Sequence, residues 1–193
     1  MDGSYLMAPS SSNKDNNRFS DVKYEGSLMF FGKGDDDFAG VVFSYVDRGH
    51  FYLVTWKKLK QRDYWHPERV TANAGIQMKL VNTSSSFGQE MRDALWSSQS
   101  TLQASVLWTD SKNTGWDYGR LYEWEITHLA STGLINLKIS TEGGILAQTG
   151  DIYDSTLRGG RLGVFCFSQQ EIIWMNLKAR CIDSTNFMKM KVI

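Results

Sequence analysis

The sequence predicts an all-β protein, a β-sandwich of nine or more short strands with one short helix. Three observations predict this fold class. Apolar and polar residues alternate with period two in several segments, turn sequences rich in glycine and aspartate separate those segments, and the 193 residues include 17 glycines but only 2 prolines. Alternation is typical of strands with one buried face, and many short strands between turns are typical of a sandwich.

The alternation is clear at 121–127, where Glu123 and Glu125 point to one face and three apolar side chains point to the other. Segment 51–57 is apolar at nearly every position, which predicts a strand buried on both faces. By the same criteria, further strands are expected at 24–31, 38–46, 75–81, 103–109, 134–140, 161–167 and 172–179.

One segment has a helical period. At 88–96, Met91, Ala94 and Leu95 recur at i, i+3 and i+4, which predicts a short helix that caps one end of the sandwich. The length suits a single domain, which we place at 21–183. Residues 1–20 and 184–193 show no periodicity and are expected to be a disordered or partial N-terminal segment and a C-terminal tail.

The charge balance limits the classes of partner. Lysine plus arginine and aspartate plus glutamate number 21 each, so no overall field favours nucleic acid. No stretch approaches the run of about 18 apolar residues that a spanning helix needs, so we expect no membrane insertion. The N-terminal residues lack the basic and apolar regions of a signal peptide. We expect the isolated chain to be monomeric.

The strongest local feature is an acidic turn made of Asp35, Asp36 and Asp37. It lies between Gly34 and a strand that begins at Phe38. Adjacent carboxylates repel one another, and hard oxygen ligands on a turn are what a Ca²⁺ site uses. The alternative is a solvated acidic turn, because the spacing does not follow the specific calcium-loop pattern.

More oxygen ligands are available in the loop at 108–118. Asp110, Asn113 and Asp117 present side-chain oxygens there. The sequence does not establish that this loop meets the acidic turn.

The pair Glu123 and Glu125 gives the best case for an enzyme. Both project from one face of a strand, as in some jelly-roll glycosidases, which place two carboxylates across a cleft. The third acidic residue expected two positions later is Thr127, and a polar solvent-facing strand explains the pair better. The alternative function is therefore a carbohydrate-binding lectin or a jelly-roll glycoside hydrolase that uses Glu123 and Glu125. The three histidines lie far apart and make no zinc pair, and no nucleophile motif is present.

Four cations are interleaved with aromatic residues at 56–65. They are Lys57, Lys58, Lys60 and Arg62. Such a pattern can contact a polyanion such as a heparan-type glycan, whereas the alternative is a solvated strand end.

Two further features depend on the compartment. Cys166 and Cys181 permit one disulfide in an oxidising environment or two reduced thiols. Asn82 begins an Asn-Thr-Ser sequon for N-glycosylation.

A set of motifs between Val22 and Asp183 is specific in its order. It includes DDDFAG, FYLVTWK, DALW, GGRLGVFCFSQ and CID. This set resembles the C-terminal domain of the thrombospondin family, closest to its cartilage oligomeric matrix protein branch. The resemblance implies a lectin-like (concanavalin-like, jelly-roll) β-sandwich that binds Ca²⁺, has no catalytic activity, and mediates cell adhesion in the extracellular matrix. The implied partners are cell-surface receptors, glycosaminoglycans and matrix proteins.

Residue by residue, the resemblance assigns the acidic turn 35–37 and Asp110 as metal ligands. The family's next carboxylate falls where this chain has Tyr118. The resemblance also implies a disulfide between Cys166 and Cys181, and it marks 51–57 as a receptor-contact segment, although we interpret that segment as a core strand. The family's Asp-rich repeats and EGF-like modules are not in this sequence, which is expected for a fragment or a diverged copy.

Overall fold

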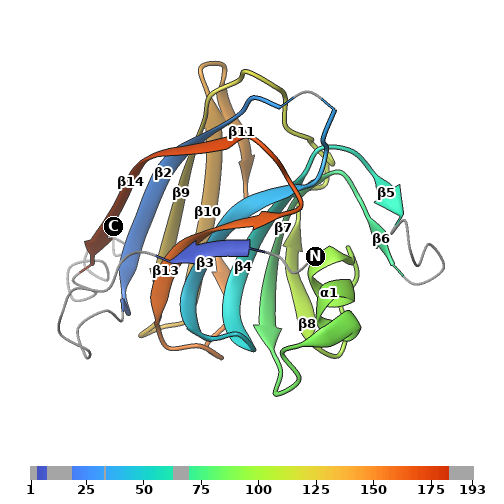
Figure 1. Cartoon of the computed structure of the whole chain (residues 1–193). Helices are drawn as coiled ribbons and strands as arrows, with labels where there is room; N and C mark the ends of the chain where they lie inside the picture. The colour runs from blue at the N-terminus through green and yellow to red at the C-terminus, as the bar shows by residue number, and fades with distance from the viewer. Residues whose placement is uncertain (1–3, 8–18, 33, 63–69, 183–193) are drawn as a thin grey trace.

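The computed structural model describes residues 4–7, 19–32, 34–62 and 70–182. Two antiparallel sheets face one another across a common core (Figure 1). We call them the first and second sheets. The prediction of an all-β sandwich with one helix is confirmed, because the predicted strands and the helix all form.

The first sheet contains six strands, and β4 lies near its centre. In spatial order the strands are β1 (Ser4–Met7), β13 (Arg161–Phe167), β3 (Phe38–Asp47), β4 (His50–Lys57), β7 (Gly75–Asn82) and β8 (Ala104–Thr109). Strand β1 pairs with the edge of β13, although its residues fall in the segment expected to lie outside the sandwich.

The second sheet is built around β9 and β2. In spatial order its strands are β11 (Gly144–Gln148), β10 (Leu134–Thr141), β9 (Tyr122–Leu129), β2 (Val22–Phe30) and β14 (Ile172–Cys181), with β12 (Ile152–Tyr153) also paired to β10. Strands β5 (Gln61–Arg62) and β6 (Thr71–Ala72) form a small separate hairpin.

The main core lies between the two sheets. The inward residues of β3, such as Val41 and Phe43, meet inward residues of the second sheet, such as Tyr122 and Trp124. Their alternation with outward residues matches the period-two pattern, because burial of the apolar face drives the sheets together.

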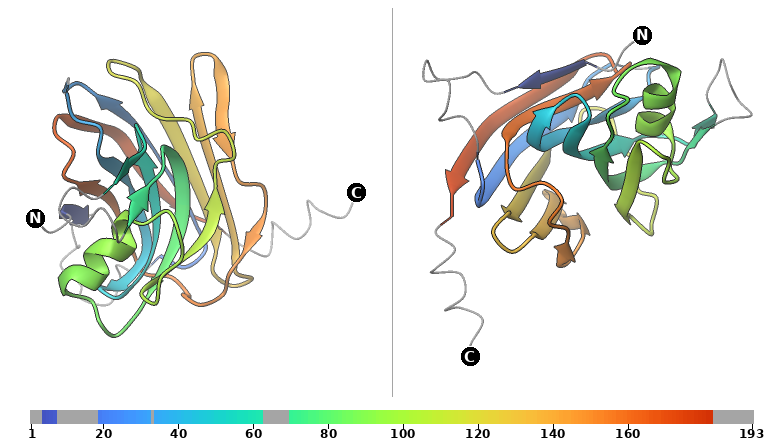
Figure 2. Two further views of the ribbon diagram at one scale, coloured as in Figure 1. Left: turned by 90° about the vertical axis from the view of Figure 1, so that its right-hand side faces the viewer. Right: turned by 90° about the horizontal axis from the view of Figure 1, so that it is seen from below.

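The helix α1 (Gly88–Trp96) covers the outer face of the first sheet. Its buried residues pack on that face, against Val42, Leu53 and Phe165, and Figure 2 shows the helix on the side away from the second sheet. The expectation that it caps one end of the sandwich was therefore wrong. Strand β4 is buried on both faces, as predicted. The helix is what covers its outer apolar face, which would otherwise be exposed to water.

A buried lysine holds the C-terminal end of this helix. Lys79 in β7 is fully buried, and its ammonium donates to the carbonyl oxygens of Ala94, Leu95 and Ser97 at 3.3, 2.8 and 2.7 Å. These carbonyls have no partner inside the helix, and the helix dipole places negative charge there. Burial lowers the pKa of Lys79 to about 7. No helix among the described residues is long and apolar enough to cross a membrane.

Candidate functional site

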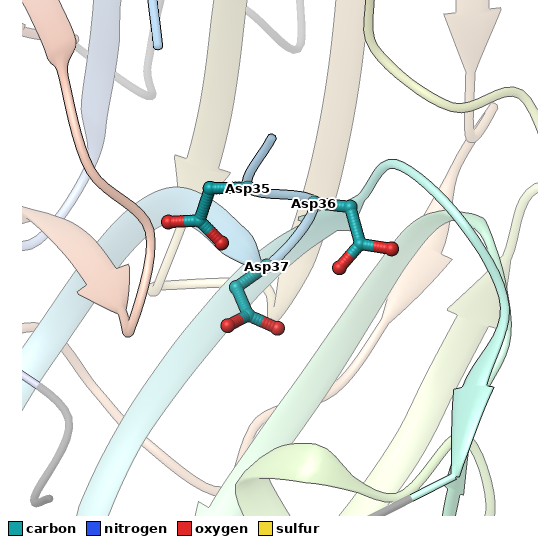
Figure 3. A group of neighbouring side chains, drawn as sticks. All are labelled: Asp35, Asp36 and Asp37. Carbon is teal, nitrogen blue, oxygen red and sulfur yellow. The ribbon is translucent and has the colours of Figure 1, made fainter. Parts of the chain in front are cut away.

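The acidic turn connects β2 to β3 at one end of the sandwich. One carboxylate oxygen from each of Asp35, Asp36 and Asp37 lies within 4.8 Å of the other two, and all three residues are half-buried. Figure 3 shows the three side chains next to one another on the turn. Consecutive residues in an extended strand would project to opposite sides, so the turn geometry is what brings these carboxylates together.

Lys57 at the end of β4 is an internal counter-ion for this turn. Its Nζ lies 3.0 Å from Oδ1 of Asp36 and 3.0 Å from Oδ1 of Asp37, and it also donates to the Asp36 carbonyl and to Oε1 of Gln61. The Lys57 side chain is fully buried, and its ammonium lies 5.3 Å from the centroid of the Trp96 ring. Lys57 is therefore removed from the set of predicted polyanion contacts.

Burial dominates the electrostatics of Asp37, whose side chain is only 15% exposed. Burial raises the pKa of the Asp37 carboxyl, and the neighbouring charges of Asp35 and Asp36 add to that rise, while Lys57 opposes it. Burial, more than the charges of Asp35 and Asp36, therefore sets the direction of this shift.

The loop that follows β8 meets the acidic turn. The hydroxyl of Tyr118 donates to the Asp35 carbonyl at 2.5 Å and accepts from the backbone N–H of Gly34 at 3.1 Å. Nearby, Nζ of Lys58 donates to the carbonyl of Trp116 at 3.1 Å and lies 4.1 Å from the centroid of the Tyr118 ring. These contacts hold the turn and the loop together.

The two other aspartates of this loop do not join the group of three. Asp110 is buried, and its carboxylate accepts from the backbone N–H groups of Lys112 and Thr114 at 3.1 and 2.8 Å. Asp117 is largely exposed and lies 3.5 Å from Arg120. Asp110 therefore shapes the loop from within, whereas the acidic turn presents its carboxylates together.

The pair Glu123 and Glu125 lies elsewhere, on the outer face of the second sheet. Both residues line a polar cavity of about 420 Å³ that also borders β2, β10 and β14. Oε2 of Glu125 is 2.6 Å from Nζ of Lys23. The two candidate sites are thus on different surfaces of the molecule.

The other predicted site residues, Lys60, Arg62 and Asn82, are not part of the acidic turn. Lys60 and Arg62 are exposed near the β5–β6 hairpin, and Asn82 is exposed at the end of β7. Arg62 belongs to β5, whereas the aromatic residues that follow it lie outside the described residues.

The disulfide that the resemblance implies is not formed in the structure. Cys166 and Cys181 are both free. They lie on β13 and β14, which belong to opposite sheets, and the Sγ of Cys166 donates to the carbonyl of Gln169 at 2.9 Å. Cys166 is half-buried, whereas Cys181 is exposed.

Most of the chain matches a known protein family. The family described as the thrombospondin C-terminal region matches residues 13–183. The chain belongs to the thrombospondin C-terminal family. This domain is 44% identical over 169 residues to thrombospondin-3 of Homo sapiens and 42% identical over 169 residues to cartilage oligomeric matrix protein of Bos taurus.

The alignments cover 86% of this thrombospondin C-terminal chain, but only 18% of thrombospondin-3 and 22% of the matrix protein. The chain therefore spans about a fifth of the length of these relatives. Among solved structures, a carbohydrate binding module, CBM66 from Bacillus subtilis, superposes with a TM-score of 0.55 over 93% of this chain and 92% of that one, at 13% identity. At this identity the likeness shows the fold alone, and the predicted lectin-like jelly-roll sandwich is confirmed.

Two side chains that contact the acidic turn of this thrombospondin domain had no signal in the sequence. Lys57 ends an apolar strand and its sequence context resembles that of the surface cations next to it, and Tyr118 stands where the family has a carboxylate. Both reach the acidic turn from segments at least 20 residues away. Only the pairing of β3 with β4 and the path of the 110–118 loop bring them there.

Proposed function

We propose that this chain is a non-catalytic, calcium-binding module of an extracellular matrix protein that acts in cell adhesion. The observation that carries the proposal is the charge of the acidic turn. Three carboxylates gather there and one ammonium, from Lys57, compensates them, which leaves two negative charges. A bound Ca²⁺ has the charge that cancels this excess.

The donor chemistry fits calcium. Ca²⁺ takes six to eight hard oxygen ligands in flexible geometry, typically from carboxylates, carbonyls and water. The carboxylates of Asp35, Asp36 and Asp37 would hold the ion, and solvent would complete its shell because the turn is half-buried. An ion there would stabilise the turn and, through the hydrogen bond between Tyr118 and Asp35, the loop beside it.

The extracellular and adhesive parts of the proposal rest on the relatives. One of them is named a matrix protein, and the exposure of Asn82 suits a glycosylated secreted chain. The proposed partners are cell-surface receptors, glycosaminoglycans or matrix proteins. The exposed side chains of Lys60 and Arg62 support the glycosaminoglycan as a partner, because neighbouring cations on a surface attract sulfated glycans.

The proposal makes the module non-catalytic. The candidate acid pair is Glu123 and Glu125, but an oxygen of Glu125 is held by Lys23 at 2.6 Å. A glycosidase needs one carboxyl that delivers a proton and a second that meets the sugar or its water. Hydrolysis of aryl glycosides that is abolished by Glu123→Gln would contradict this part.

Thermal unfolding with and without calcium tests the central claim. A ligand present at a hundredfold excess over its Kd and bound only to the native state stabilises it by about 2.7 kcal/mol, which corresponds to a rise in Tm of roughly 5–10 °C for a domain of this size. We expect that rise between chelator and millimolar Ca²⁺, and its loss in Asp35→Asn and Asp37→Asn.

The matched control is Glu142→Gln, which removes an exposed carboxylate in another turn and should keep the full calcium response. Magnesium at the same ionic strength controls for screening. An unchanged Tm in wild-type protein, or equal responses in all four proteins, would refute the calcium claim.

A further inference from the structure

The outer face of the second sheet carries a polar cleft that the calcium proposal does not use. Its volume is about 420 Å³, and four neighbouring strands, β10, β9, β2 and β14, line it. The charged residues of the lining are Glu25, Glu123, Glu125, Lys138 and Lys178. The acidic turn belongs instead to the connection between β2 and β3.

Ion pairs within and around the cleft cancel most of its charge. Glu125 contacts Lys23 at 2.6 Å and Lys138 at 3.9 Å. Glu25 contacts Arg180 at 2.7 Å. A cation entering the cleft would meet the two lysines of its lining, and an anion would meet three carboxylates, so neither kind of ligand is favoured by charge.

The groups left free for a ligand both donate and accept hydrogen bonds. The Glu123 carboxylate is exposed and has no hydrogen bond or ion pair with any described residue. Beside it the cleft presents the hydroxyls of Ser27 and Ser140 and the amide of Asn176. Asn176 lies in a bulge of β14, between Met175 and Lys178, where the strand leaves its register with β2.

The floor of the cleft includes the paired residues Gly26 of β2 and Trp124 of β9. The Trp124 side chain points the other way, into the main core, where it is 3% exposed. The indole lies against Gly26, where an added Cβ would approach a ring carbon of Trp124 to 2.7 Å.

We propose that this cleft binds a neutral saccharide unit. A sugar ring carries several neighbouring hydroxyls, each both donor and acceptor, and it is uncharged, which suits a cleft whose charges are largely paired. An apolar ligand does not fit, because the exposed lining is mostly polar. The volume lies within the range of about 300–1,000 Å³ typical of small-ligand sites.

The proposal is independent of calcium and goes beyond the proposed function. It gives the module a second surface, through which it would contact the neutral part of a glycan while the acidic turn holds the ion. Asp37→Asn should therefore leave saccharide binding intact, and Glu123→Ala should leave the calcium response of Tm intact.

An array of neutral glycans, followed by saturation-transfer NMR with free lactose, maltose and cellobiose, tests the proposal. We expect wild-type protein to bind at least one neutral glycan. Glu123→Ala removes an acceptor and Ser140→Leu fills the cleft, and each should weaken that binding at least tenfold. The exposed Glu142 does not line the cleft, so Glu142→Ala should bind as wild type does.

Absence of binding to every neutral glycan would overturn the proposal. Binding that survives both cleft substitutions would overturn the assigned location. Preference for sulfated over neutral glycans would also contradict it and would point to the exposed cations near the β5–β6 hairpin. Circular dichroism spectra and Tm values of the variants separate loss of binding from loss of fold.

Discussion

Oγ of Ser44 lies 2.8 Å from Nδ1 of His128, and this hydrogen bond joins the two sheets inside the sandwich. Ser44 belongs to β3 of the first sheet and His128 to β9 of the second. The imidazole is fully buried and packs edge-on to the rings of Phe43 and Tyr52. The site therefore accommodates neutral histidine, and protonation there would place a charge in the core.

The first prediction is that stability falls in mild acid. Burial lowers the pKa of His128 from 6.5 to about 4, and the charges of Asp21 and Asp154 oppose this only in part. Below pH 6.5 the unfolded chain binds a proton that the folded chain excludes, so the free energy of unfolding decreases from pH 6.5 down to about 4, by roughly 3 kcal/mol in total.

Urea unfolding of wild type and of His128→Gln between pH 7 and 5 measures this effect. The variant has no group that titrates at position 128, so its stability should be lower at pH 7 but flatter with pH in that range. Parallel curves for the two proteins would show that His128 is not the cause.

The second prediction concerns Lys79 and the helix. Its pKa in the folded chain is about 7, below the ordinary value of 10.5, so the unfolded chain binds more protons between these values and stability rises with pH in that range, by roughly 4 kcal/mol. Lys79→Met should remove this rise. The three helix carbonyls also lose their donor, which costs about 1–3 kcal/mol and offsets part of the stability that the variant gains at pH 7 by losing the titrating group.

Guanidinium unfolding at pH 7 and pH 9.5 provides the measurement. Lys112 is exposed in the loop after β8, so Lys112→Met is the matched control and should behave as wild type. A rise with pH that persists in Lys79→Met would contradict the prediction.

The third prediction is that Lys57 competes with calcium. Lys57→Met removes the ammonium that lies 3.0 Å from two carboxylates. Without calcium the variant should be less stable by about 2–4 kcal/mol, because the carboxylates lose their partner. Its calcium affinity should rise by about tenfold or more, because a repulsive charge beside the ion is gone.

Isothermal titration calorimetry with Ca²⁺ measures the affinity, and Lys60→Met, which removes an exposed cation nearby, is the control. Weaker calcium binding in Lys57→Met would mean that the lysine organises the turn for the ion rather than competing with it.

The fourth prediction concerns Tyr118. Tyr118→Phe deletes one hydroxyl, which bonds both to the Asp35 carbonyl and to the Gly34 backbone N–H. A hydrogen bond of this kind contributes about 1 kcal/mol, so we expect calcium affinity to fall about fivefold as the turn loses its support. Tyr153 is 67% exposed, so Tyr153→Phe should leave the affinity unchanged. Equal affinities in both variants would exclude a role for the hydroxyl.

Much of the fold could be predicted because its signals are local. Alternation located nine strands, and the helical period located α1 at residues 88–96. The strands β1, β5, β6, β11 and β12 were missed. Three of them, β5, β6 and β12, have only two residues, which cannot display a period. The outer position of α1 was also missed, because periodicity identifies an apolar face but not which surface it covers.

The candidate metal site could also be predicted from the sequence only in part. The sequence by itself determined that Asp35, Asp36 and Asp37 lie together, because they are consecutive in a turn. Only the tertiary structure decided that Lys57 and Tyr118 contact that turn, that Asp110 faces its own loop, and that four strands form a cleft around Glu123. Those relationships join residues up to about 150 positions apart, and they follow from strand order and register, which no local pattern encodes.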